Sequence, residues 1–122
     1  MTEKVIKEGT GWRLGWDPQR DNYQGLVAGE DWAIELTAPE FADFCSLLQQ
    51  LASTMAAMAE ELMPEETITC DAETELLWME ASGFPDNYGI RFILNTGRGF
   101  EGGWNGAIVP EVIRASYVPQ EQ

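Results

Sequence analysis

Carboxylates dominate the side chains that could carry chemistry in this sequence, which has 21 Asp and Glu residues, two Cys and no His. Without His, the common acid–base catalysts, the Ser-His-Asp and Cys-His nucleophiles and all His-containing metal sites are excluded. Paired carboxylates could still perform acid–base chemistry, but among so many acidic residues the spacing singles out no pair. We therefore predict a protein that is not an enzyme.

Neither the cysteines nor the densest acidic segment predicts a metal or cofactor site. Cys45 and Cys70 are far apart and form no CxxC pattern, so we expect two reduced thiols that lie partly in the core. The segment DAETE (71–75) lacks the spaced ligands and the glycine of a calcium loop, and a solvated turn is the favoured interpretation. No cofactor is predicted.

A glycine-rich segment, GRGFEG (97–102), matches the G-x-G-x-x-G pattern. A dinucleotide site requires a helix directly after this pattern and an acidic residue about 20 positions further on. The residues that follow, GWNGAIVP, do not begin a helix for several positions. We therefore predict a hairpin around 97–106, whose glycines permit positive φ and close approach of strands.

Arginine and aromatic side chains of the second half are candidates for stacking on nucleic-acid bases. The candidate binding residues are Arg91, Arg98, Phe100 and Trp104. Trp78 and Phe92 belong to the same pattern, and Trp12, Trp16 and Trp32 could act likewise. Packing in the core is the favoured alternative, because each aromatic lies on an alternating strand.

The formal net charge of −14 bears on the choice of partner. Such a chain repels phosphate backbones, and its basic residues form no run, so the charge argues against nucleic acid and favours a basic protein partner. The N-terminus lacks an apolar signal region, and no stretch of about 18 apolar residues occurs. These features predict a cytoplasmic protein that does not associate with membranes.

Two periodicities predict the elements that position these residues. Alternation of apolar and polar residues predicts eight short strands, which lie at 3–7, 12–16, 24–28, 32–36, 66–71, 76–80, 88–94 and 100–104. A turn is expected at 83–86. Trp12, Leu14 and Trp16 should share one face of their strand.

A capping box at Thr37 and Glu40, with Pro39 in the first turn, predicts the start of a long helix at about 38–62. Its wide apolar stripe favours packing on a sheet. The alternative is a helix-mediated dimer, for which Met55, Met58 and Met63 would be adaptable contacts. A short helix is expected from 110 to about 117, and residues 118–122 should fray.

The tripeptide Asp-Asn-Tyr occurs at 21–23 and 86–88, each time before the third predicted strand of its half. Pro39-Glu40 and Pro110-Glu111 then begin the helix that ends each half. We therefore predict an α+β fold with two ββββα units, in which antiparallel sheets pack against the helices. The chain would be a single domain, 1–122, built as a pseudo-repeat of 1–63 and 64–122.

Five segments carry a resemblance to a family of small uncharacterised cyanobacterial proteins: GTGWRLGWDP, LVAGEDWAIELT, EFADFCSLLQQL, LLWMEASGFP and GRGFEGGWNG. By this resemblance, which spans nearly the whole chain, the fold is grouped with the Whirly-type single-stranded-DNA-binding transcriptional regulators. Those proteins use a lysine-bearing KGKAAL-type strand, which has no counterpart here. The resemblance therefore assigns no DNA-binding residue and no activity.

Two functions follow as hypotheses. The leading one is a non-enzymatic protein-binding or assembly module, either a monomer or a helix-mediated dimer, that engages a basic partner. The alternative, by analogy of fold, is a single-stranded nucleic-acid-binding protein related to transcription.

Overall fold

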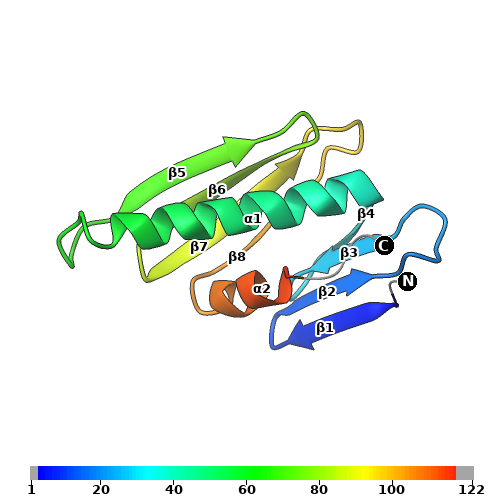
Figure 1. Ribbon diagram of the computed structural model, residues 1–122, viewed down its shortest axis with the longest axis horizontal. Coiled ribbons are helices and arrows are strands. Elements are labelled where there is room, and N and C mark those ends of the chain that lie inside the picture. The colour runs from blue at the N-terminus through cyan, green and yellow to red at the C-terminus, as the bar shows by residue number, and fades with distance from the viewer. Residues whose placement is uncertain (1–2, 118–122) are drawn as a thin grey trace.

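The computed structural model describes residues 3–117, so the fraying expected of 118–122 lies outside the described residues. Two four-stranded antiparallel sheets follow the orders β1-β2-β3-β4 and β5-β6-β7-β8 (Figure 1). The elements are β1 (Val5–Gly9), β2 (Trp12–Trp16), β3 (Gly25–Ala28), β4 (Ala33–Leu36), α1 (Ala38–Met58), β5 (Ile68–Glu73), β6 (Leu77–Phe84), β7 (Asn87–Leu94), β8 (Glu101–Trp104) and α2 (Val109–Ala115). This arrangement confirms the predicted α+β fold with four strands and a helix in each half.

Strand alternation in the first sheet sorts the side chains as the pattern predicts. Trp12, Leu14 and Trp16 are buried on the inner face of β2, whereas Arg13 is exposed on the outer face. The register pairs Trp16 with Gly25 of β3. A Cβ at Gly25 would lie 2.8 Å from the Phe41 ring, so only glycine leaves room there for the first turn of α1.

The second sheet contains the longest pairing, between β6 and β7, which runs from Leu77 opposite Leu94 to Phe84 opposite Asn87. The turn expected at 83–86 is therefore shorter, because β6 continues to Phe84. Gly83 has φ of +141°, and a Cβ there would lie 2.8 Å from the Asn87 carbonyl oxygen. A glycine at this position lets the strand continue where another residue would end it.

The capping box that predicts α1 is present. Thr37 Oγ1 accepts from the Glu40 amide at 3.3 Å, and Glu40 Oε1 accepts from the Thr37 amide at 2.9 Å. The helix ends at Met58, before the expected residue 62, and the Glu61 and Leu62 amides both donate to the Met58 carbonyl in the turn that follows. Negatively charged side chains are unfavourable near the C-terminus of a helix, where the helix dipole is itself negative. Glu60 and Glu61 would lie at that end if the helix continued to residue 62.

Helix α1 contacts strands of both sheets (Figure 1). Its large apolar side chains are buried in this packing. The buried set on α1 includes Phe41, Phe44, Cys45, Leu47, Leu48, Leu51 and Met55. Cys45 and Leu47, which widen the stripe, therefore pack within the chain. A helix-mediated dimer stays a prediction: of its three candidate contacts, Met55 is buried, Met58 is half-buried and Met63 is 60 % exposed. Within residues 3–117, no helix has the length and apolar character needed to cross a membrane.

Aromatic rings join the two sheets. The ring centroid of Trp32, which immediately precedes β4, lies 5.3 Å from that of Trp104, 5.5 Å from Phe100 and 5.8 Å from Phe92. Trp104 Nε1 donates to the Ala28 carbonyl oxygen at 3.2 Å. We call Trp32, Phe92, Phe100 and Trp104 the aromatic junction.

The two Pro-Glu pairs each tie one half of the chain to the other. Glu40, the third residue of α1, accepts from Arg98 of the second half. Glu111, the third residue of α2, accepts from Trp12 Nε1 of the first half at 2.6 Å. A motif that begins each helix locally therefore also supplies a contact between the halves.

The glycine-rich segment forms the connection between β7 and β8 and then β8 itself, as the hairpin interpretation predicts. Alanine at two of its glycines should have different effects on the stability of the protein. A Cβ at Gly103 would lie 2.4 Å from the Ile90 carbonyl oxygen, whereas a Cβ at Gly97 would meet nothing within 4 Å. We expect Gly103→Ala to lower the free energy of unfolding by about 1–3 kcal/mol, because backbone must shift.

Gly97→Ala is the matched control, and it should leave stability unchanged or raise it by about 0.4–1 kcal/mol through the unfolded chain. Urea unfolding of the two variants measures the difference. Equal stability of both would contradict the close approach of β7 and β8.

A candidate protein-binding face on the second sheet

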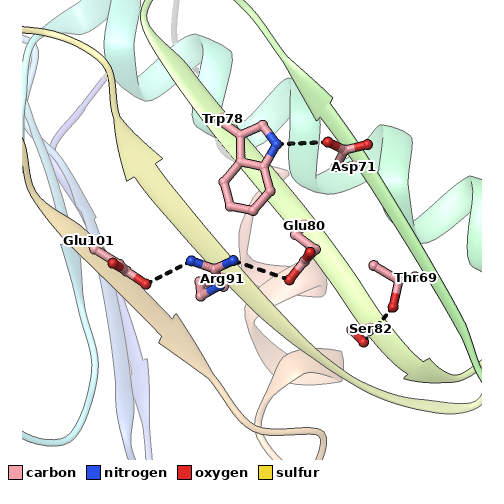
Figure 2. Close-up of polar contacts among 7 residues, drawn as sticks. All are labelled: Thr69, Asp71, Trp78, Glu80, Ser82, Arg91 and Glu101. Atoms are coloured by element: carbon pink, nitrogen blue, oxygen red, sulfur yellow. Dashed lines mark hydrogen bonds and ion pairs between the residues drawn. The ribbon is translucent and has the colours of Figure 1, made fainter.

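The outer face of the second sheet is the side opposite α1 (Figure 2). On β5 to β8, every second side chain points to this face. These side chains are Thr69, Asp71, Glu73, Trp78, Glu80, Ser82, Arg91, Ile93 and Glu101. The register aligns Asp71, Glu80 and Arg91 in one row across three strands. We call this set the outer face.

Trp78 lies half-buried on the outer face, and contacts on two sides fix its indole (Figure 2). Its Nε1 donates to Asp71 Oδ2 at 2.8 Å. The Arg91 guanidinium carbon lies 4.8 Å from the centroid of the ring, within the range of a cation–π contact. An aromatic side chain is therefore held in one orientation on a face that no described helix covers.

Arg91 is engaged by carboxylates of its neighbouring strands. Its Nη1 lies 2.9 Å from Glu101 Oε2, and its Nη2 lies 3.6 Å from Glu80 Oε1. The hydrogen bond to Glu101 raises the pKa of Arg91, and the charges of Glu80 and Glu101 add to the rise. The cation is thus permanently charged and already paired on both sides.

The charge of the outer face is negative. Four carboxylates, those of Asp71, Glu73, Glu80 and Glu101, stand against the single cation of Arg91. A phosphate that approached Arg91 would meet carboxylates on either side of it. A lysine or arginine of a partner would meet complementary charge.

The structure places the four predicted binding residues in three different surroundings. Arg91 belongs to the outer face. Phe100 and Trp104 come together in the aromatic junction, where Trp104 is only 6 % exposed and its N–H is bonded. Arg98 lies at the start of α1, where it donates to Glu40 and to the Glu35 carbonyl, and its guanidinium is 4.5 Å from the Tyr23 ring.

Sequence reasoning missed the acidic members of the outer face, and it considered Trp78 only as one of many aromatics. The signal for Trp78 is its phase: Leu77 and Met79 point into the core, so the residue between them points out. For Asp71, Glu80 and Glu101 no comparable signal exists, because outward acidic residues occur throughout this chain.

The two cysteines lie where the sequence predicts, partly in the core. Cys45 is buried on α1, and Cys70 is half-buried on β5, with its Sγ 3.6 Å from Met55 Sδ. Burial raises the pKa of the Cys70 thiol, and the charge of Asp71 adds to the rise. Less of this thiol is therefore in the nucleophilic thiolate form than in an exposed cysteine. Among residues 3–117, no group of three or more Cys, Asp or Glu side chains is placed to hold a metal ion.

The fold and the outer face define an α+β protein of two four-stranded meanders with an uncovered acidic and aromatic sheet face. The chain belongs to the family described as a domain of unknown function, DUF1818, which it matches over residues 7–118. It is similar to a crystal structure of a protein with unknown function, described as from the DUF155 family, from Prochlorococcus sp. NATL2A. The two are 32 % identical with a TM-score of 0.87 over 92 % of this chain and 95 % of that one. No curated protein matches this sequence.

Proposed function

We propose that this protein is a non-enzymatic binding module whose outer face docks a basic segment of another protein. The observation that carries the proposal is the fixed, half-buried indole of Trp78 among carboxylates. Tryptophan and arginine are the side chains that most often dominate binding energy at protein interfaces. Here one of each is already in contact on an open sheet.

Preorganisation supports this use of the face. Because Asp71 and Arg91 hold the indole in place, little side-chain freedom is left to lose when a partner covers it. The hydroxyls of Thr69 and Ser82, 2.8 Å apart, extend the ordered network along the same face (Figure 2). A partner would therefore meet a surface that is set before binding.

Charge selects the class of partner. The excess of carboxylates on the outer face has the same sign as the net charge of −14 for the whole chain. The field of the protein would steer a cationic segment toward the face, and salt would screen this attraction. Binding should therefore weaken as ionic strength rises.

We further propose a fold group, a source for the family and a cellular location for this protein. The fold is grouped with the Whirly type, as the paired four-stranded sheets and long helix support. The family is cyanobacterial, as the sequence resemblance implies. The protein acts in the cytoplasm. It has no catalytic role, which the absence of His from the sequence supports.

Replacing Trp78 with alanine should weaken binding of a short peptide rich in lysine, arginine and leucine by about 30-fold or more, the effect of losing an interface hot spot. Isothermal titration calorimetry at low salt measures the dissociation constant. Ile6→Ala is the matched control, because Ile6 is an apolar residue that is 54 % exposed on the other sheet.

Equal affinity of the wild-type and Trp78→Ala proteins would exclude the outer face as the docking site. A single-stranded oligonucleotide added in place of the peptide tests the alternative function. If it quenches tryptophan fluorescence at low salt while the peptide does not bind, the nucleic-acid hypothesis replaces this one.

A further inference from the structure

A hollow of about 310 Å³ lies beside α2, and the chain's second Asp-Asn-Tyr motif lines part of it. Its apolar lining includes Tyr88, Val109, Pro110 and Ile113. Asp86 and Arg114 contribute the charges at its rim. The volume is within the range of pockets for small ligands, and the mixture of apolar walls with few polar groups is typical of them.

The first half of the chain shows what the same motifs hold. There Tyr23, from the first Asp-Asn-Tyr, and Glu40, from the first Pro-Glu, lie on two sides of the Arg98 side chain. The guanidinium stacks 4.5 Å from the centroid of the Tyr23 ring and donates to the Glu40 carboxylate. An arginine that arrives from another part of the chain thus occupies the space between the tyrosine and the start of the helix.

In the second half the corresponding residues, Tyr88 and Pro110, line the hollow. Glu111 accepts from Trp12 Nε1 at 2.6 Å, so its carboxylate is already engaged with the first sheet. Asp86 and Asn87, which also line the hollow, carry side-chain acceptors, and Asn87 Oδ1 lies against Gly106, where a Cβ would be only 1.9 Å away. The hollow therefore offers an aromatic ring and carboxylate or amide oxygens, the kinds of group that hold Arg98 in the first half.

We propose that this hollow receives the guanidinium group of an arginine from a partner protein, in the position that Arg98 takes in the first half. Guanidinium stacks on aromatic rings and bonds to carboxylate oxygens in one plane, which a lysine ammonium does not do. The site is separate from the outer face, and it rests on the proposed function only in that the arginine comes from a protein partner.

The charges at the rim make the proposal specific. Asp86 attracts a guanidinium and Arg114 repels it, and both side chains are exposed, so either can be exchanged without disturbing the core. Asp86→Asn should weaken binding, and Arg114→Gln should strengthen it, each by about two- to fivefold. A site for anions would show the opposite order.

The probe is N-acetyl-arginine amide, titrated into the isotope-labelled full chain while the amide resonances are followed by NMR. We expect saturable shifts at Tyr88, Gly106 and Val109. N-acetyl-citrulline amide, which has the same shape without the charge, should cause much smaller shifts. Tyr88→Phe keeps the ring and should retain binding, whereas Tyr88→Leu should lose it, with thermal melting used to confirm that both variants fold.

Equal shifts with the citrulline compound, or no saturable shift with the arginine compound, would overturn the proposal. The proposal would also be overturned if acetate shifted the same amide resonances and the Arg114→Gln substitution abolished those shifts. Trp78→Ala should leave the arginine titration unchanged. The two proposals are therefore tested independently. Failure of peptide binding at the outer face would not contradict arginine binding in the hollow, and failure of arginine binding would not contradict the outer face as a docking site.

Discussion

Replacing Glu40 with alanine should lower the free energy of unfolding by about 3 kcal/mol or more, because one side chain performs two tasks. Its carboxylate caps the Thr37 amide at 2.9 Å and also accepts from Arg98. The side chain of Glu40 is 5 % exposed and that of Arg98 is 29 % exposed. Removal of Glu40 leaves an uncapped helix start and a partly buried cation without its partner.

Two further variants separate these contributions. Glu40→Gln can still complete a capping box but removes the charge, so its effect should be smaller than that of Glu40→Ala. Arg98→Met removes the cation and leaves the cap. Urea unfolding of the single and double variants gives the coupling between positions 40 and 98, which we expect to be about 1 kcal/mol or more. A loss below about 1 kcal/mol in Glu40→Ala would show that neither role is significant.

Replacing Trp104 with alanine should destabilise the protein by about 3–5 kcal/mol, the range for removing a large aromatic from a core. Trp104 packs against Trp32, Phe44 and Phe92, with centroids 5.3–6.0 Å apart. It belongs to β8 but bonds to Ala28 of β3, so it links the two sheets. The cavity left by alanine would lie at the aromatic junction.

Trp104→Phe retains an aromatic ring and removes the N–H, which leaves the buried Ala28 carbonyl without this donor. We expect it to lose less stability than Trp104→Ala but still about 1–3 kcal/mol. Trp78→Ala is the control, since Trp78 lies on the outer face and its loss should change stability by about 1 kcal/mol or less. Thermal unfolding followed by circular dichroism distinguishes the three. If Trp78→Ala were as destabilising as Trp104→Ala, the outer face would belong to the core and not to a binding site.

The tryptophans show how similar residues acquire different roles. Trp78 and Trp104 both lie on strands of the second sheet, and both are aromatic candidates in the sequence. Their phase on the strand sends Trp104 toward the first sheet and Trp78 away from it. The phase is readable from the sequence once a strand is assigned, but the side of the sheet that α1 covers is not.

Short-range features of this protein follow from the sequence by itself. The capping box joins residues three positions apart, and the alternation of Trp12, Leu14 and Trp16 joins residues two apart. Such relations depend on local backbone geometry, which is the same in any fold. The end of α1 departs from the pattern because several weak effects act together there: charge at the helix end, the turn after Met58, and the following Pro64.

The tertiary structure decided which distant groups meet. Arg98 and Glu40 are 58 positions apart, Trp104 and Ala28 are 76 apart, and Trp12 and Glu111 are 99 apart. Nothing in their local sequence selects Glu40 and Glu111 among 21 acidic residues, or the Ala28 carbonyl among all the backbone carbonyls. The path of the chain brings them together, because two sheets must bury their apolar faces around one helix. That same packing leaves the outer face of the second sheet uncovered, with Trp78 half-buried and Arg91 exposed on it.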